Sequence, residues 1–201
     1  MAEAAVIPKK ERKTKKPAEK IPDYLIYEIS GGKPIYYWGY RDVINKTKTF
    51  EEIKIESQLQ AGLKAEITML IGLLLKKLGY QLATGELGLN LSGKDKRGAD
   101  LAIYKSQNWK WEAKFSDLPP EVVIEVDTQA ELEGITEVEY VSQKIKDYLA
   151  FGVKKVIWIF TKGKIVFVAT PELPWLTYDW DTEIEVVGGV TFKLNEVVKA
   201  V

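Results

Sequence analysis

The chain has 201 residues, of which 46% are hydrophobic and 29% charged, the composition of one soluble globular domain. It contains no histidine and no cysteine, which excludes Ser-His and Cys-His nucleophilic catalysis, zinc fingers, iron–sulfur clusters and disulfide scaffolds. Any metal must therefore be bound by oxygen ligands, and Asp and Glu carboxylates select hard cations such as magnesium or manganese.

The distribution of charged and apolar residues bears on location and partners. Basic and acidic residues are equal at 29 each, yet residues 1–20 hold seven basic against three acidic residues without apolar periodicity. We expect a disordered basic arm there, which either aids solubility or attracts nucleic-acid phosphates without sequence preference. The longest apolar stretch, Ile67–Leu75, is too short to cross a bilayer. Together with the lack of cysteine, this predicts a cytoplasmic protein without a membrane partner.

The first folded elements are predicted to be a β-hairpin and a long helix. Tyr24–Ile29 and Lys33–Tyr37 are aromatic and β-branched runs separated by Ser-Gly-Gly, which is typical of a hairpin. Thr49 and Glu52 have the spacing of a capping box, and a long helical pattern follows them. Apolar residues recur there every three or four positions before Gly79, which predicts one buried stripe: Leu59, Leu63, Ile67, Leu70, Leu74 and Leu78.

The rest of the chain is predicted to hold strands around a second helix. That helix covers Glu137–Phe151 and ends at Gly152, and its predicted buried face is Val138, Val141, Ile145 and Leu149. Alternation and turn residues predict eight further strands: Tyr80–Thr84, Leu87–Leu91, Ala99–Tyr104, Glu121–Asp127, Lys155–Phe160, Lys164–Ala169, Glu183–Val187 and Val190–Leu194. This order indicates a mixed sheet flanked by helices.

A polar segment rich in aromatic residues lies between two of these strands. It holds Trp109 and Trp111 beside Lys105, Lys110 and Lys114. Basic residues interleaved with aromatic ones can follow a phosphate backbone and stack on bases. The alternative is that the loop folds its tryptophans onto its own domain.

Three carboxylates lie within the two most apolar predicted strands. In Ala99–Tyr104 the alternation of a strand puts Asp100 on one face, and in Glu121–Asp127 it puts Glu125 and Asp127 together on one face. An acidic residue at a strand edge is ordinarily solvated. A central strand covered on both faces would instead bury these charges at a large cost, unless a metal or basic groups compensate them.

The spacing of these acids resembles a known nuclease pattern. An acid in one strand followed about 25 residues later by a second acid, from Asp100 to Glu125, resembles the Asp…Glu-x-Lys arrangement of the PD-(D/E)XK nuclease superfamily. Asp127 stands where that motif has its lysine, so the standard motif is broken. Lys144 in the following helix is a substitute, since a lysine moved from the strand to that helix is a known variation within the superfamily.

The wider sequence resembles the bacterial Uma-two family of candidate restriction endonucleases, which has this superfamily fold. The matching segments are Tyr27–Tyr37, Ser57–Gln60, Gly98–Ala102, Pro119–Thr128, Lys144 with Tyr148, and Gly152–Trp158. The resemblance implies an α/β (α+β) restriction-endonuclease-like fold, with a mixed central sheet, flanking helices and an N-terminal hairpin in a single domain over residues 21–201. Many members have a histidine where this chain has Gln58 or Gln60, and an apolar residue in place of Asp127.

The resemblance implies a metal-dependent endonuclease that hydrolyses DNA phosphodiester bonds. Asp100 and Glu125 would hold one or two Mg²⁺ or Mn²⁺ ions, with Asp127 as an additional ligand, and Lys144 would orient or activate the attacking water. Members of the superfamily often pair two sites, so a homodimer is expected. The alternative is a catalytically inactive nuclease-fold protein that binds nucleic acid or a protein, which Asp127 at the lysine position favours. For Lys144 taken alone, the alternative to a site residue is a solvated helix lysine.

Overall fold

The computed structural model describes residues 20–127, 130–132 and 134–199, so residues 1–19 of the expected basic arm lie outside the described residues. The helices are α1 (Tyr40–Ile44), α2 (Phe50–Ile53), α3 (Gln58–Lys77), α4 (Glu137–Phe151) and α5 (Leu194–Lys199), with 3-10 turns at Asp23–Leu25 and Ser106–Asn108. The strands are β1 (Ile26–Ser30), β2 (Lys33–Tyr36), β3 (Tyr80–Ser92), β4 (Asp95–Lys105), β5 (Val122–Val126), β6 (Lys155–Phe160), β7 (Ile165–Ala169), β8 (Leu176–Asp179), β9 (Ile184–Val187) and β10 (Val190–Phe192).

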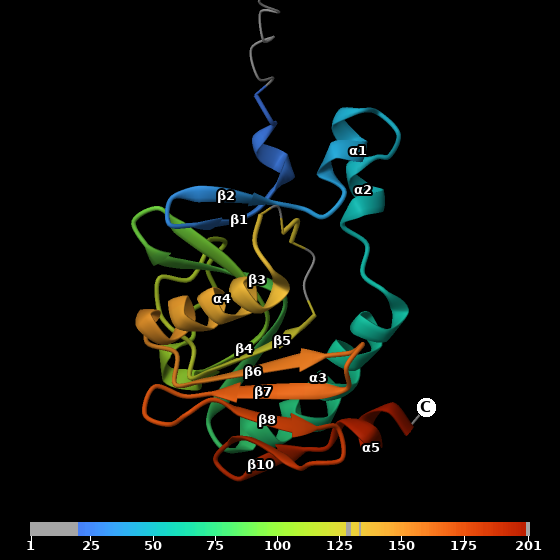
Figure 1. Cartoon of the computed structure of the whole chain (residues 1–201). Helices are drawn as coiled ribbons and strands as arrows, with labels where there is room; N and C mark the ends of the chain where they lie inside the picture. The colour runs from blue at the N-terminus through green and yellow to red at the C-terminus, as the bar shows by residue number, and fades with distance from the viewer. Residues whose placement is uncertain (1–19, 128–129, 133, 200–201) are drawn as a thin grey trace, which may run out of the picture.

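Within the described residues the main sheet has eight strands, in the order β2-β1-β4-β5-β6-β7-β8, with β3 also paired to β4. Strands β5 and β6 run parallel and the other neighbours antiparallel. Helices α3 and α4 cover opposite faces, because α3 packs with Ile124 and α4 with Val123 of the same strand (Figure 1). The predicted mixed sheet flanked by helices is thus confirmed, and none of the helices described is long and apolar enough to cross a membrane.

The long predicted helix is divided in two. The Thr49–Glu52 capping box is present, but it opens only the four-residue α2. A second capping box, formed by Ser57 and Gln60, starts α3. The predicted stripe was partly wrong: Leu63 and Ile67 are buried, with Ile71 and Leu75 completing the face, whereas four of its members are exposed: Leu59, Leu70, Leu74 and Leu78. Apolar residues occur on several faces of this helix, so their spacing alone does not show which face meets the sheet.

Helix α4 spans Glu137–Phe151 as predicted and ends at Gly152, whose φ of 115° is a left-handed cap. Val138 was wrongly predicted to be buried: its side chain is 70% exposed in the first turn, while Leu149 is half-buried. The buried face of the helix carries two tyrosines and a lysine, and it comprises Tyr140, Val141, Lys144, Ile145 and Tyr148. Helix α4 therefore presents polar groups to the sheet.

A bulge in β3 changes the direction of one acidic side chain. The two short strands predicted at Tyr80–Thr84 and Leu87–Leu91 are one long strand with a register shift between them. At the shift Glu86 has a φ of 59°, in the left-handed region that few non-glycine residues adopt. Glu86 lines the same small cavity as Asp100 of the neighbouring strand.

Candidate active site

Asp100 and Glu125 lie side by side on adjacent strands. The β4–β5 register pairs Leu101 with Ile124, which places Asp100 across from Glu125 in the antiparallel ladder. Asp100 Oδ2 accepts a hydrogen bond of 2.8 Å from the backbone N–H of Val126. The two acids that the sequence singled out are therefore brought together at one place in the sheet.

Glu125 is held by two residues of α4. Lys144 Nζ lies 3.2 Å from Glu125 Oε1, and the Tyr148 hydroxyl donates to the same oxygen at 2.5 Å. Lys144 and Tyr148 are four residues apart, so they share one helix face. The same Tyr148 hydroxyl lies 2.6 Å from the carbonyl oxygen of Gly98, so its single proton is shared between two acceptors, which ties α4 to β4. The predicted association of Lys144 with Glu125 is present, with both side chains almost wholly buried.

Sequence reasoning missed a third acid, Glu28 on β1, which is 2% exposed. Its carboxylate accepts from Lys144 Nζ at 2.8 Å, Arg97 Nη1 at 2.8 Å, the Tyr140 hydroxyl at 2.6 Å and the Gly98 N–H at 3.0 Å. The signal was available, because Glu28 interrupts an aromatic and β-branched run just as Asp100 and Glu125 do.

Arg97 joins this network to the outer face of α4. Its guanidinium forms an ion pair with Asp147 and donates through Nη2 to the Ser30 hydroxyl at 2.7 Å, while its side chain is 1% exposed. Two buried cations, Arg97 and Lys144, therefore compensate the carboxylates of Glu28, Glu125 and Asp147. Burial of charge on this scale is tolerated only because each group has charged and hydrogen-bonding partners.

The two acids that Lys144 contacts, Glu28 and Glu125, have pKa values shifted in opposite directions. Burial alone would raise the pKa of Glu28, but Lys144 and Arg97 outweigh it and the pKa is lowered. Burial raises the pKa of Glu125 to about 8, since Lys144 opposes it only in part and Asp100 adds repulsion. Burial acts to lower the pKa of Lys144, but Glu125 and Glu28 raise it overall, so the ammonium stays charged. Glu125 is therefore a buried carboxylate with incomplete charge compensation.

The solvent side of the site is built around Asp100. Lys64, from α3, places Nζ 3.2 Å from Asp100 Oδ1 and also forms an ion pair with Glu56. Burial and the nearby Asp100 raise the pKa of Glu86. A small cavity opens here, lined by Tyr27, Glu56, Gln60, Glu86, Asp100, Val126 and Asp127. Its lining is thus rich in carboxylate oxygens.

Asp127 has contacts that do not involve the other acids. It follows β5 with a φ of 55°, and both of its carboxylate oxygens accept from Thr161, at 2.8 Å from the backbone N–H and 2.6 Å from the hydroxyl. These bonds join the end of β5 to the turn after β6. Its assignment as an additional metal ligand stays a prediction, with the side chain engaged elsewhere in this structure.

The side chains near Asp100 and Glu125 determine whether a divalent metal ion fits this site. Among the described residues no three His, Cys, Asp or Glu side chains form a group arranged to hold a metal. A pair of carboxylates is nevertheless what Mg²⁺ commonly takes from a protein, because it keeps several waters and binds substrate phosphate. Burial and the nearby Asp100 favour a bound proton on Glu125, and a cation beside the two acids would replace that proton. Asp100 and Glu125 thus fit the ion.

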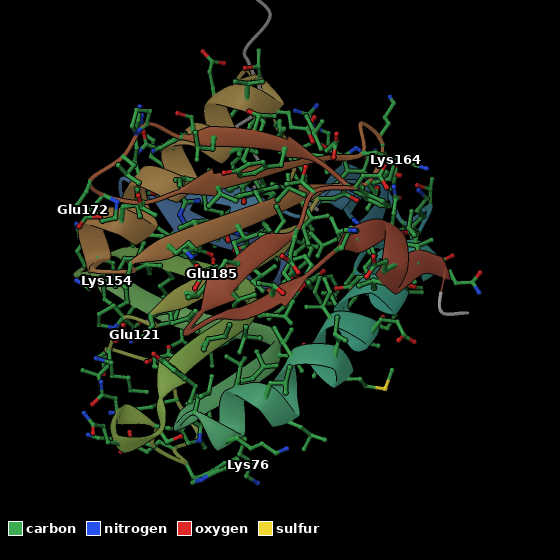
Figure 2. All side chains as sticks on the ribbon, turned by 90° about the horizontal axis from the view of Figure 1, so that it is seen from below. Lys76, Glu121, Lys154, Lys164, Glu172 and Glu185 are labelled. Carbon is green, nitrogen blue, oxygen red and sulfur yellow. The ribbon has the colours of Figure 1, made fainter. Side chains whose placement is uncertain are left out.

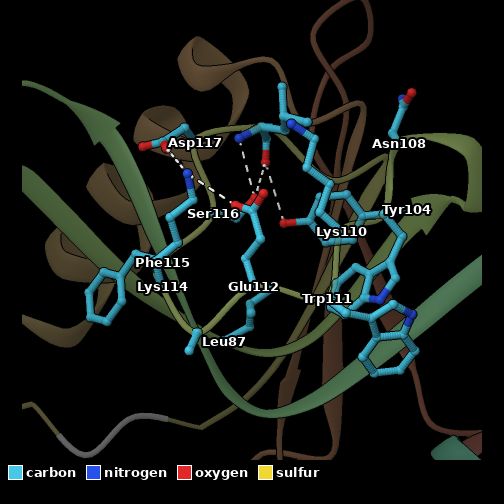
Figure 3. Close-up of a pocket in the computed structure, with 13 residues that line it drawn as sticks. Leu87, Tyr104, Asn108, Lys110, Trp111, Glu112, Lys114, Phe115, Ser116 and Asp117 are labelled. Atoms are coloured by element: carbon cyan, nitrogen blue, oxygen red, sulfur yellow. Dashed lines mark hydrogen bonds and ion pairs between the residues drawn. The ribbon is translucent and has the colours of Figure 1, made fainter.

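The aromatic loop forms a separate cavity of about 470 Å³ over residues 108–118 (Figure 3). Trp109 packs against Tyr104 with ring centroids 5.4 Å apart, as the self-folding alternative predicted, and Trp111 packs on Trp109 while remaining 85% exposed. Lys114 bridges two acids of the same loop, Glu112 at 3.0 Å and Asp117 at 3.6 Å. The charges of this loop are therefore largely used within it.

Comparison with known proteins identifies the fold and the family. A solved structure described as a "putative nuclease belonging to DUF820" from Anabaena variabilis ATCC 29413 is similar with a TM-score of 0.63. The match covers 86% of this chain and 89% of that chain at 14% sequence identity, and so supports the fold alone. No curated protein matches the sequence. The sequence model of the Uma2 family, "Putative restriction endonuclease", matches residues 50–192. The chain therefore belongs to the Uma2 family, as the sequence resemblance predicted.

Proposed function

We propose that the protein is a divalent-metal-dependent endonuclease that hydrolyses phosphodiester bonds of DNA. The observation that carries this proposal is the placement of Asp100 across from Glu125 on neighbouring strands, with Lys144 3.2 Å from Glu125. Membership of the Uma2 family and the nuclease-like fold support the reaction class. DNA as the substrate and magnesium or manganese as the ion are part of the proposal.

In this proposal Asp100 and Glu125 hold the metal ion. When bound, Mg²⁺ or Mn²⁺ lowers the pKa of a coordinated water and neutralises charge on the scissile phosphate. The protein's own groups prepare the ligands: the Val126 N–H fixes one oxygen of Asp100, and the Tyr148 hydroxyl fixes one oxygen of Glu125. The ligands are thus oriented before substrate arrives.

Lys144 acts on the reaction through Glu125. Its ammonium contacts Glu28 and Glu125 and is 2% exposed, so its charge favours the ionised form of Glu125 from inside the protein. Glu28, which is itself paired with Arg97, is the second acid that holds the lysine in place. This assigns Lys144 a positioning and electrostatic role that differs from the expected direct contact with the attacking water.

The proposal is tested by cleavage of supercoiled plasmid and of single-stranded DNA with Mg²⁺ or Mn²⁺. We compare the wild type with Asp100→Asn, Glu125→Gln and Lys144→Met, and use Lys76→Met as the control. Lys76 is exposed in the last turn of α3 and extends away from the sheet (Figure 2). All three site variants should lose at least about 100-fold in rate, as removal of transition-state stabilisation requires. Activity that all three variants retain would refute the site.

The same experiment distinguishes the proposed endonuclease from the alternative, a noncatalytic binding protein. A wild-type protein that binds DNA in the presence of metal, yet leaves plasmid intact, would support that alternative. The burial of Lys144 is the structural feature that favours it, since this lysine cannot reach a substrate without breaking two ion pairs.

A further inference from the structure

Two lysines, from helices on opposite faces of the sheet, reach the two proposed metal-binding acids. Lys144 of α4 contacts Glu125, and Lys64 of α3 contacts Asp100, each with a nitrogen–oxygen distance of 3.2 Å. Only Lys144 stands where a migrated motif lysine is expected. Lys64 follows Leu63 in the long helix, where no sequence motif marks it.

The two ammonium groups differ in their access to substrate. The side chain of Lys144 is 2% exposed and its two acidic partners 0% and 3%. It is also surrounded by aromatic rings, at 5.5 Å from the Trp158 centroid and 5.7 Å from that of Tyr148. A phosphate could reach it only after the removal of a buried charge pair, which is costly.

Lys64 lies on the side that opens to solvent. Its side chain is 11% exposed, and its partners Asp100 and Glu56 are 13% and 22% exposed. Both partners line the small cavity of the site, together with Gln60 one turn earlier on α3. Water therefore reaches the Glu56 side of this ion pair more readily than it reaches Lys144, so a change of partners costs Lys64 less than it would cost Lys144.

The charge balance of the cavity requires a cation that faces the substrate. Four acids line it: Glu56, Glu86, Asp100 and Asp127. Lys64 forms ion pairs with two of them, Glu56 and Asp100. A phosphodiester that approaches such a surface is repelled unless positive charge compensates it. A bound metal ion would supply part of this charge, and the Lys64 ammonium, which is paired with two of the lining acids, would supply more.

We propose that Lys64, and not Lys144, is the lysine that contacts the scissile phosphate, and that its ammonium neutralises Asp100 until a divalent ion binds there. The inference rests on the proposed function and deepens it. Bound metal takes over the neutralisation of Asp100, and Lys64 then becomes available to a phosphate oxygen. Loss of Lys64 should accordingly affect metal binding and phosphate binding in opposite directions.

The test measures metal and DNA binding separately from cleavage. Mn²⁺ alone is titrated calorimetrically into the wild type, Lys64→Met, Lys64→Gln and Lys144→Met, with Lys76→Met as the control from the same helix. Affinity for a short DNA duplex is measured by fluorescence anisotropy with Ca²⁺, and cleavage is measured with Mn²⁺. Circular-dichroism melting shows that each variant is folded, and the Gln variant replaces the Met variant where the latter is unfolded.

Removal of the Lys64 charge should tighten Mn²⁺ binding by roughly 5-fold or more, because a cation that competes for Asp100 is lost. The same variants should bind the duplex about 10-fold more weakly and cleave about 100-fold more slowly. Lys64→Arg should restore part of the duplex affinity. Lys144→Met should instead weaken Mn²⁺ binding.

Two outcomes overturn the inference. Lys64 variants that lose Mn²⁺ binding together with cleavage would show a residue that only positions Asp100, and variants equal to the wild type in duplex affinity and cleavage would show no role. Both are distinct from failure of the proposed function, in which the wild type itself neither binds Mn²⁺ nor cleaves DNA. In that case the assignment of Lys64 fails with it.

Discussion

Lys144 donates to Glu28 over 2.8 Å, and both side chains are withdrawn from solvent. This contact links the N-terminal hairpin to α4 across β4, between residues 116 positions apart in the chain. The hairpin is thus part of the site's framework, and its acid supports the lysine that contacts Glu125.

We predict that Glu28→Gln destabilises the fold by about 3–5 kcal/mol, because Lys144 and Arg97 would keep their buried charges and lose a shared carboxylate. Urea unfolding followed by tryptophan fluorescence measures the change. Glu172→Gln is the matched control, since Glu172 is exposed in the loop after β7 (Figure 2). A change for Glu28→Gln no larger than for the control would mean that the network contributes nothing to stability.

The stability of the metal-free protein should depend on pH through Glu125. Its pKa is raised by burial from an ordinary value near 4.5 to about 8 in the folded chain. Between these values the folded protein binds a proton that the unfolded chain has released, so this group's contribution is full below pH 4.5 and is lost as pH rises to about 8. The slope should reach about 1.4 kcal/mol per pH unit.

Chemical denaturation with a chelator present, at intervals from pH 4.5 to 8.5, measures this dependence. Glu125→Gln cannot ionise, so subtraction of its profile from the wild-type profile isolates the contribution of Glu125. A difference that stays flat, or that rises with pH, would show that Glu125 is ionised throughout and fully compensated by Lys144.

Asp127→Asn should leave Mn²⁺ affinity within about 3-fold of the wild type, since both carboxylate oxygens of Asp127 are engaged by Thr161. Asparagine tolerates the positive φ at this position, so the variant tests the charge and the hydrogen bonds. We expect a loss of about 1–2 kcal/mol in unfolding free energy, measured by urea denaturation. A fall in Mn²⁺ affinity as large as that of Asp100→Asn would instead make Asp127 a ligand, as first expected from the sequence.

Local patterns predicted most of the fold. The hairpin, α4 and β6 were located closely because turn residues, a terminal glycine and apolar patterns act over a few residues. The buried face of α3 and the exposure of Val138 depend on which side of a helix meets the sheet, which is a tertiary property. The short elements α1, α5 and β8 gave no signal, since four to six residues hold too few repeats to show periodicity.

The candidate site was predicted in part. Asp100 and Glu125 were singled out because charges in apolar strands require compensation, and Lys144 because of the resemblance to the nuclease pattern; the structure brings these three together. The contacts of Glu28 and Arg97, and that of Lys64 with Asp100, join residues 36 to 116 positions apart, and spacing within one element carries no information about such contacts. The expected homodimer and the basic arm stay predictions.

The proposed mechanism depends on Asp100 and Glu125 holding one divalent ion together. This is tested by calorimetric titration of Mn²⁺ into the wild type, Asp100→Asn, Glu125→Gln and the control Lys76→Met. We predict saturable binding by the wild type and the control, with affinity reduced at least about 10-fold in each acid variant. Equal binding by all four proteins, or no binding by the wild type, would contradict the claim.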